Sequence, residues 1–263
     1  MASVSISQIF YLNVLVMKTL VIGGTGLVGK GVCEKLKNTG NEVIVGTPSN
    51  GVNILTGEGL ANALDGTDIV IDLSNSPSPE AKIALNFFKT AANNLVKAVK
   101  AAGIRHYLVL SIVGIDRAQH IGYLRAKKHQ EDAVIESGIP YTIIRSTQFH
   151  EHVGTIIDVQ GDGKNVHVST VDYQPIALED VVDYVVRFSL EEPKNKIVEI
   201  AGPDRGLMSD IVEGYLREKG SDRVVIANDN DKYMFEDIPR SLLVPSGEFF
   251  PGKIRFSDWT KKQ

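Results

Sequence analysis

The sequence predicts an α/β fold in which helices cover both faces of a doubly wound parallel sheet. From Lys18 to about Leu190, short runs of β-forming apolar residues alternate with segments of helical pattern. The first apolar run leads directly into the glycine-rich stretch VIGGTGLVG (21–29), and a helical pattern follows. Strands that alternate with helices in this way are joined by right-handed crossovers, so the strands lie parallel in one sheet.

Five strands and the helices between them are predicted in order along this part of the chain. Continuous apolar runs, typical of parallel strands buried on both faces, lie at 18–22, 42–45, 68–73, 106–112 and 141–144. Helical periodicity predicts helices over 27–37, 80–102 and 123–137, followed by the helix-ending glycines Gly40, Gly103 and Gly138. Thr56 is predicted to cap a short helix that runs to Leu64.

After Arg145 the alternation becomes less regular. A GDG turn at 161–163 and a β-like piece at 166–169 come first, then helices predicted at 179–190 and 207–219 and strands at 197–201 and 224–227. We expect residues 146–176 and 203–263 to form a small C-terminal substrate-covering region that is built into the same domain.

A single domain is expected over residues 17–263, because the first strand pattern opens at Met17. Residues 1–16 are predicted to be an appended N-terminal segment. Their apolar run IFYLNVLV has no Lys or Arg before it and is too short to cross a bilayer. An interfacial anchor is the alternative for this segment.

Composition and charge argue against nucleic-acid and membrane partners. Of the 263 residues 43% are hydrophobic and 23% are charged, with a net charge of −4. The chain therefore lacks the basic surplus that binds nucleic acid or an anionic membrane. The one cysteine, Cys33, lies in the apolar pattern of a helix, which predicts a buried thiol. A reducing, cytoplasmic compartment fits this cysteine usage.

The glycine-rich stretch has the spacing of a dinucleotide-binding turn. Gly24-x-Gly26-x-x-Gly29 gives one form of the pattern, and Gly23, Gly26 and Gly29 give a more open form. Without a Cβ the backbone can turn tightly and approach a pyrophosphate, which then meets the positive end of the next helix. A tight turn that binds nothing is the alternative. We expect cofactor contacts from Gly23, Gly24, Thr25, Gly26, Leu27, Val28 and Gly29.

The loop after the second strand bears on which nucleotide binds. NAD-selecting domains place Asp or Glu there to hold the ribose 2′-hydroxyl, and residues 46–50 contain no acid. Thr47 and Ser49 could instead donate hydrogen bonds to a 2′-phosphate, although no Arg or Lys stands beside them. The sequence therefore favours NADP(H) over NAD(H).

Three residues form a candidate catalytic set. Ser111 lies at the carboxyl end of the fourth strand, at the sheet edge where ligands bind, and Tyr123 and Lys127 are four positions apart on the next helix. That spacing places both side chains on one helix face, where the ammonium is expected to lower the pKa of the Tyr123 phenol. The phenol would then donate a proton to a carbonyl that receives hydride, while Ser111 holds the same oxygen. A chance pair on a helix is the alternative.

Seven stretches in a specific order cover most of residues 17–204. They are VIGGTGLVG (21–29), DLSNSPS (72–78), LVLSIVGID (108–116), YLRAKKHQED (123–132), SGIPYTIIRSTQFHE (137–151), YQPIALEDV (173–181) and EIAGPD (199–204). Together they resemble the atypical, NmrA-like branch of the short-chain dehydrogenases/reductases. The resemblance implies a Rossmann-type fold that binds NAD(P), with Ser111, Tyr123 and Lys127 as the catalytic set. In atypical members the Tyr is often lost or displaced while the Lys remains, and some members are regulators without catalysis.

The same resemblance implies ligand contacts after the third and fifth strands. Asp72, Ser74 and Asn75 would contact the adenosine and ribose of the cofactor. Gln148, Phe149 and His150 would face the substrate. No metal is expected, because His150 and His152 stand two positions apart without further ligands nearby. The other polar candidates, His120, His129 and His167, are expected to be solvent-exposed.

These observations together predict an NAD(P)H-dependent oxidoreductase that prefers NADP and transfers hydride to a small carbonyl or quinone-like substrate. The alternative is a non-catalytic, redox-sensing regulator that binds NAD(P) and a protein partner. A third reading is an epimerase or dehydratase with tightly held cofactor, although its usual extra acid/base pair is not recognisable. The sequence leaves open whether the chain forms a homodimer.

Overall fold

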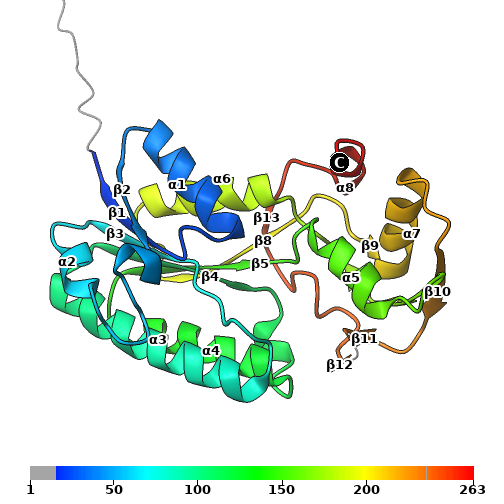
Figure 1. Cartoon of the computed structure of the whole chain (residues 1–263), viewed down its shortest axis with the longest axis horizontal. Coiled ribbons are helices and arrows are strands. Elements are labelled where there is room, and N and C mark those ends of the chain that lie inside the picture. The colour runs from blue at the N-terminus through cyan, green and yellow to red at the C-terminus, as the bar shows by residue number, and fades with distance from the viewer. Residues whose placement is uncertain (1–15, 235) are drawn as a thin grey trace, which may run out of the picture.

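Seven parallel strands form the central sheet of the protein (Figure 1). The computed structural model describes residues 16–234 and 236–263. The strands are β1 (Lys18–Ile22), β2 (Glu42–Gly46), β3 (Ile69–Asp72), β4 (His106–Ile112), β5 (Tyr141–Ser146), β8 (Lys196–Ala201) and β13 (Phe250–Pro251). Their order across the sheet is β13-β8-β5-β4-β3-β1-β2. The predicted doubly wound α/β fold is confirmed.

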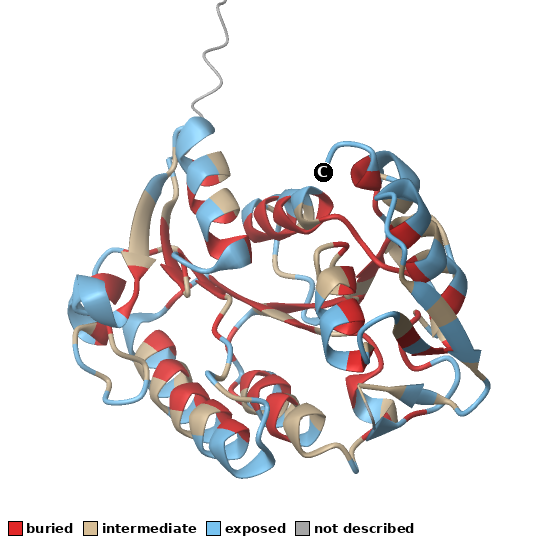
Figure 2. Ribbon diagram, turned by 45° about the vertical axis from the view of Figure 1, so that its right-hand side comes forward, coloured by how far each residue is buried: buried red, intermediate tan, exposed pale blue. Residues whose placement is uncertain are grey.

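Helices cover both faces of this sheet (Figure 1). On one face lie α1 (Leu27–Asn38) and α6 (Leu178–Leu190), and on the other lie α2 (Leu60–Leu64), α3 (Ala81–Ala102) and α4 (Gly122–Glu136). Within β1, Val21 packs into the core under α1 and α6, whereas its neighbours Leu20 and Ile22 pack into the core under α2 and α3. Because both faces are covered, the strands read as continuous apolar runs, and buried residues follow them through the molecule (Figure 2).

The strand order reverses beside β1, and this reversal positions the site. The chain runs from β1 outward to β2 and then returns to β3, which pairs with the other side of β1. The crossover helices α1 and α2, which come before and after β2 in the chain, therefore lie on opposite faces of the sheet. In sheets of this kind a crevice opens at the carboxyl ends of the strands where the order reverses.

A second group of elements follows the carboxyl ends of β5 and β8 (Figure 1). Its helices are α5 (His152–Gln160), α7 (Met208–Glu218) and α8 (Phe256–Thr260). Its strands are β6 (Asn165–Ser169), β7 (Asp172–Tyr173), β9 (Gly206–Leu207), β10 (Val224–Asn228), β11 (Lys232–Tyr233) and β12 (Glu236–Asp237), which pair as β6 with β10, β7 with β9 and β11 with β12. These elements, called here the C-terminal subregion, share a separate apolar core that includes Ile156, Val168 and Val212.

Two polar clamps hold the end of the chain against the central sheet. Arg117, in the 3₁₀ turn η2 (Ile115–Arg117), donates hydrogen bonds to the carbonyls of Ser241, Leu242 and Val244 at 2.8–3.1 Å. The buried Asp180 carboxylate in α6 accepts the backbone N–H groups of Lys253 and Ile254, each at 2.9 Å. Between these clamps β13 extends the sheet beside β8.

The start of α2 differs from its prediction. The helix begins at Leu60 after Gly59, so the expected cap by Thr56 is wrong. Gly59 has a positive φ of 73°, and a Cβ there would lie 1.8 Å from the Gly51 carbonyl oxygen. The Thr56 hydroxyl instead accepts the N–H of Glu58 within the preceding turn. A contact between Gly51 and Gly59 thus sets the helix start, and local cap chemistry does not.

The sequence analysis did not predict the helices α5 and α8 or the two-residue strands β7, β9, β11, β12 and β13. The expectation for residues 1–16 lies, apart from Val16, outside the described residues. Among the helices that the structure describes, none combines the length and the apolar character needed to cross a bilayer. Cys33 is a buried free thiol, as predicted.

Candidate active site

The turn between β1 and α1 is built so that only glycine fits. Gly23 has a φ of +74°, and the N–H of Gly26 donates to its carbonyl at 2.9 Å. A Cβ on Gly29 would lie 2.2 Å from the same carbonyl oxygen, closer than any real contact. The first turn of α1 has no acidic residue and no side-chain cap. Its N–H groups are therefore free to bind an anion such as a pyrophosphate.

One cavity of about 440 Å³ joins this turn to the candidate catalytic residues. From the glycine turn and α1 it is lined by Gly23, Gly26, Leu27, Val28 and Gly29, and from the loop after β3 by Leu73, Ser74 and Asn75. Its remaining wall comes from Leu110, Ser111, Ile112, Tyr123, Lys127, Ser146, Thr147, Gln148, Phe149 and His152. The structure thus brings the predicted catalytic set and most of the predicted cofactor contacts to one site.

Lys127 is buried in the wall of this cavity, with 4% of its surface exposed. Its Nζ donates to the carbonyl of Ser74 at 3.1 Å and lies 4.7 Å from the centre of the Phe88 ring. Burial lowers the pKa of Lys127 to about 8, against the opposing effect of the Asp72 and Glu131 charges. An ammonium has three N–H donors, and Ser74 is its one hydrogen-bond partner among the described residues. Lys127 therefore has donors to offer a ligand in the cavity.

Tyr123 does not have the environment that the sequence predicted. Its hydroxyl donates to Oδ1 of Asn75 at 2.6 Å, and its ring packs edge-on against Phe88 at 6.0 Å. Burial raises the pKa of Tyr123, so the expected lowering by Lys127 is wrong. Moving a charged phenolate out of water costs more free energy than the hydrogen bond to Asn75 recovers, so burial favours the protonated phenol. Tyr123 is a protonated phenol at neutral pH, and its proton is held by Asn75.

Ser111 carries an unpaired hydroxyl beside the cavity. The residue is 3% exposed, and its Oγ has no hydrogen-bond partner in the described part of the chain. Buried polar groups are nearly always paired in folded proteins. The orphaned hydroxyl of Ser111 therefore indicates that a ligand completes this part of the site.

The other predicted contacts divide between the cavity wall and its surroundings. Ser74, Asn75, Gln148 and Phe149 line the cavity, whereas Gly24 and the exposed Thr25 belong to the turn without lining it. Thr47 and Ser49 follow the carboxyl end of β2 and share a hydrogen bond of 3.0 Å. Their place next to β1 leaves them as a predicted subsite for the adenosine end of the cofactor.

Asp72 and His150, two of the predicted ligand contacts, lie outside the cavity wall. The Asp72 carboxylate is fully buried and accepts hydrogen bonds from Ser74, Tyr107 and Gln130, so it faces the interior of the sheet. His150 is also fully buried, with Nε2 bonded to the carbonyl of Pro175 at 3.0 Å. Its ring packs against two aromatic rings of α8 at 5.1 and 5.4 Å. Neither side chain lines the cavity.

Several functional residues were missed or undervalued from the sequence. Thr147 and His152 line the cavity. The Phe88 ring packs against the Lys127 ammonium, and the Gln130 amide donates a hydrogen bond to Asp72. Position in the sequence could have indicated Thr147 and His152, because both lie in the segment after the fifth strand that also contains Gln148. Phe88 and Gln130 lie on amphipathic helices, where nothing in the local pattern separates a site residue from a core residue.

The histidines expected at the surface, His120, His129 and His167, are exposed. Among the residues that the structure describes, no three His, Cys, Asp or Glu side chains gather as metal ligands. The site is therefore described by its hydrogen-bonding groups and its lysine.

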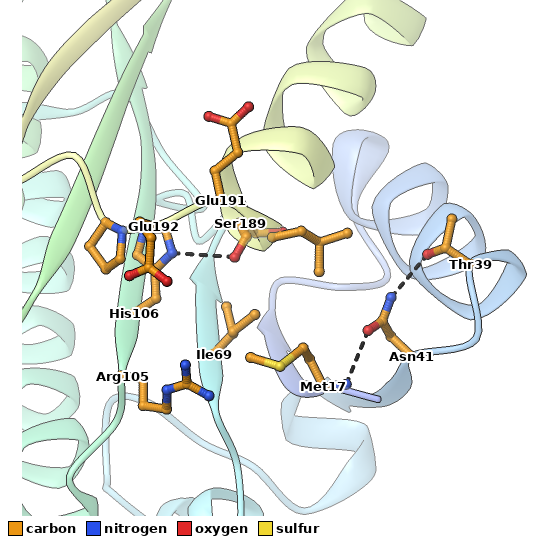
Figure 3. A pocket seen from close by; sticks show the side chains of 11 residues that line it. Met17, Thr39, Asn41, Ile69, Arg105, His106, Ser189, Glu191 and Glu192 are labelled. Atoms are coloured by element: carbon orange, nitrogen blue, oxygen red, sulfur yellow. Dashed lines mark hydrogen bonds between the residues drawn. The ribbon is translucent and has the colours of Figure 1, made fainter. Parts of the chain in front are cut away.

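A second cavity, of about 450 Å³, opens at the opposite edge of the sheet (Figure 3). It lies at the amino ends of the strands, between Met17, Ile69, Arg105 and the end of α6. Buried His106 borders it and is fully bonded, since Nδ1 donates to the carbonyl of Ser189 and Nε2 accepts from the Thr142 hydroxyl. The buried histidine at this edge is therefore already paired at both ring nitrogens.

The fold is that of a nucleotide-binding α/β protein, and a buried lysine lies in the wall of the cavity beside its glycine turn. Residues 23–192 match the NAD(P)H-binding family, and the chain belongs to it. The predicted resemblance to atypical short-chain dehydrogenases/reductases is thereby confirmed.

Known relatives and neighbours differ in their named roles. The photosystem II assembly factor Ycf39 of Synechocystis sp. is 23% identical over 93% of this chain and 76% of its own. The chloroplastic divinyl chlorophyllide a 8-vinyl-reductase of Arabidopsis thaliana is 24% identical over 73% of this chain and 54% of its own. The structure of an NADPH-dependent quinone oxidoreductase, QOR2 of Escherichia coli with NADPH, has a TM-score of 0.65 at 20% identity and covers 80% of this chain and 78% of that one. This structural likeness concerns the fold alone.

Proposed function

We propose that the protein is an NADPH-preferring reductase that transfers hydride to a small carbonyl or quinone-like substrate. The observation that carries the proposal is the single cavity that joins the glycine turn to Lys127 and Ser111. A nucleotide on the turn would extend along this cavity, and the unpaired Ser111 hydroxyl lies at its far end. The reductase name of the Arabidopsis relative supports the same reaction class.

The residues present fit a nicotinamide dinucleotide. The glycine turn and the N–H groups of α1 would hold its pyrophosphate, and the free donors of Lys127 would hold the nicotinamide ribose. When bound, the reduced nicotinamide supplies the hydride. Ser111 would donate a hydrogen bond to the acceptor oxygen of the substrate as negative charge develops there. Leu110, Ile112 and Phe149 would exclude water from this end of the cavity.

The proton for the reduced substrate is better assigned to Lys127 than to Tyr123. With its pKa at about 8, Lys127 can both donate and regain a proton near neutral pH. The Tyr123 phenol has a raised pKa and must first break its bond to Asn75. In this proposal Lys127 transfers the proton, directly or through a bound water, and Tyr123 orders Asn75 on the cavity wall.

The preference for NADP(H) rests on the loop after β2. Thr47 and Ser49 present hydroxyls there, and residues 46–50 contain no carboxylate that would repel a 2′-phosphate. Binding of NADPH and NADH to the same preparation, followed by cofactor fluorescence, measures the preference directly. We expect NADPH to bind more tightly, and equal or tighter binding of NADH would contradict the assignment.

The test of the reaction is NADPH oxidation with a panel of quinones, aldehydes and ketones. Lys127→Met is expected to lower turnover by 100-fold or more, on the order of the contribution of an acid–base group. Tyr123→Phe is expected to retain most of the activity. Cofactor binding is measured for each variant, so that lost turnover can be separated from lost binding. A large loss in Tyr123→Phe with normal NADPH binding would return the acid role to Tyr123.

A second function, a dinucleotide-sensing regulator, is favoured by one observation. The Tyr123 hydroxyl is committed to Asn75, which leaves the usual catalytic phenol unavailable in this state. A related protein bears the name of an assembly factor. If NADPH and NADP⁺ bind with different affinities and no acceptor in the panel is reduced, the regulator becomes the better proposal.

A further inference from the structure

The Asp72 carboxylate is buried without an ion-pair partner. It stands at the end of β3 with no exposed surface. Its Oδ1 accepts the N–H of Ser74 at 2.9 Å, and its Oδ2 accepts the hydroxyl of Tyr107 at 3.0 Å and the amide of Gln130 at 2.7 Å. All three donors are neutral, because Tyr107 itself has a pKa raised well above its ordinary value by burial. None of the ion pairs formed among the described residues involves Asp72.

Ser74 joins this carboxylate to Lys127. The Ser74 N–H points to Asp72, while the Ser74 carbonyl accepts from Nζ of Lys127 at 3.1 Å. Gln130, one turn along α4 from Lys127, bonds both the Asp72 carboxylate and the Ser74 hydroxyl, the latter at 3.3 Å. The anion and the cation therefore sit on the two sides of one residue, in a buried network that spans β3, β4 and α4.

The remaining charges near Lys127 are already balanced. Glu131 on α4 is fully buried, and its two carboxylate oxygens bind the Arg145 guanidinium at 2.8 and 3.0 Å. Tyr123 from the same helix and Tyr107 from β4 are neutral phenols, and Phe88 from α3 presents its ring. Asp72 and Glu131 are the two carboxylates whose charges act on Lys127. Of these, Asp72 is the one without a cation of its own.

We infer that Asp72 is the counter-charge of Lys127, a positioning residue that holds the ammonium form inside the cavity without touching substrate or cofactor. The inference rests on the proposed function only for the role of Lys127, since the charge coupling itself needs no reaction. Burial disfavours the ammonium and the Asp72 charge favours it. Asp72 thus sets the pH at which the lysine of the site changes charge.

Asp72→Asn tests the inference, because it removes the charge and keeps the shape. The Lys127 titration is followed by NMR on protein with [ε-¹³C]lysine, and its resonance is identified by its absence in Lys127→Met. We expect the Lys127 midpoint to fall by about one pH unit or more, the effect of losing an opposite charge at close range. Gln130→Leu is the matched control, because it removes a hydrogen bond and leaves both charges, and we expect a smaller change. An unchanged midpoint in Asp72→Asn overturns the inference.

A double variant keeps the test decisive if Asp72→Asn folds poorly. Asp72→Asn/Lys127→Met replaces the two charges with a neutral pair, so we expect it to be more stable than Asp72→Asn in urea unfolding. Losses that simply add in the double variant contradict the coupling. Neither measurement needs turnover, so a protein that reduces no acceptor still reports on Asp72, and an active enzyme without coupling disproves this inference alone.

Discussion

Among single residues, burial drives Lys127 and Tyr123 toward their neutral forms. It lowers the pKa of the lysine to about 8 and raises the pKa of the tyrosine. The same physical cause therefore makes the two residues unequal near neutral pH, because the lysine can still exchange a proton and the phenol cannot. The sequence analysis treated Tyr123 and Lys127 as one catalytic unit. In the folded protein the lysine has a lowered pKa, and the tyrosine is a protonated phenol that donates a hydrogen bond to Asn75.

Gly29→Ala is expected to abolish NADPH binding. Its new Cβ would lie 2.2 Å from the Gly23 carbonyl oxygen and 2.7 Å from the Cα of Gly24. The turn must therefore open, and its N–H groups would no longer point toward the pyrophosphate. Isothermal titration with NADPH measures the loss. Gly154→Ala in α5 is the control, because nothing lies within 4 Å of its Cβ and affinity should be unchanged. Tight NADPH binding by folded Gly29→Ala would show that the turn does not hold the cofactor.

At the scale of elements, α4 carries both the site and its attachment. One turn of the helix presents Lys127 to the cavity, and the next holds Glu131 against Arg145 of β5. Arg145 also bonds Asp116 in η2 at 2.9 Å, and Arg117 in the same turn clamps the chain at 241–244. A series of ion pairs and hydrogen bonds therefore connects α4 to the sheet, and the sheet to the C-terminal subregion.

Arg145→Met is expected to destabilise the protein by about 3–5 kcal/mol, because the fully buried Glu131 loses both hydrogen bonds from the guanidinium and keeps Lys128 at 4.0 Å as its nearest cation. The free energy of unfolding in urea measures the effect. Arg187→Ala serves as the comparison, since its pair with Glu191 is largely exposed and should contribute about 0.2–1 kcal/mol. Equal losses in the two variants would contradict the special role of the buried pair.

At the scale of the whole molecule, two neutral histidines lie at opposite ends of the fold. His106 is buried at the start of β4, and His150 is buried between the central sheet and α8. Burial lowers the pKa of each to about 4. Below pH 6.5 both histidines become protonated in the unfolded chain but stay neutral in the folded protein, so acid favours unfolding.

Stability is therefore expected to fall as the pH drops from 6.5 toward 4, by about 3 kcal/mol for each histidine. Urea unfolding at pH 7, 5.5 and 4.5 gives the slope. His106→Asn should flatten it, whereas removal of the exposed histidine in His120→Gln should leave it as in the wild type. An identical slope in His106→Asn would mean that His106 is not held neutral.

The parts of the fold that depend on local pattern were predictable from the sequence. The first five strands, the long helices and the glycine turn follow from apolar periodicity and from glycine spacing, and the structure places them where expected. The start of α2 was not predictable, because it depends on the approach of Gly59 to Gly51 in the folded chain. β13 is two residues long, too short to leave any pattern.

Side-chain direction limited the prediction of the site. Asp72 ends β3 and His150 follows β5, both at the expected edge of the sheet. They turn inward because β4, α4 and α8 supply hydrogen-bond donors and aromatic rings. These partners are remote in sequence from Asp72 and His150, so the local strand pattern contains no information about them. Position along a strand therefore located the site, while the partners that decide each role came from elsewhere in the chain.

The late arrival of β13 has a consequence for the chain as it leaves the ribosome. β8 ends at Ala201, and the strand that covers its outer side is not made until Phe250 and Pro251. At about 5–20 residues per second, that interval lasts roughly 3 to 10 s. Throughout it the nascent sheet presents an open border to which another growing chain can pair. β13 later covers the end of that border at Ile200 and Ala201, and its Pro251 has no N–H to offer to a further strand.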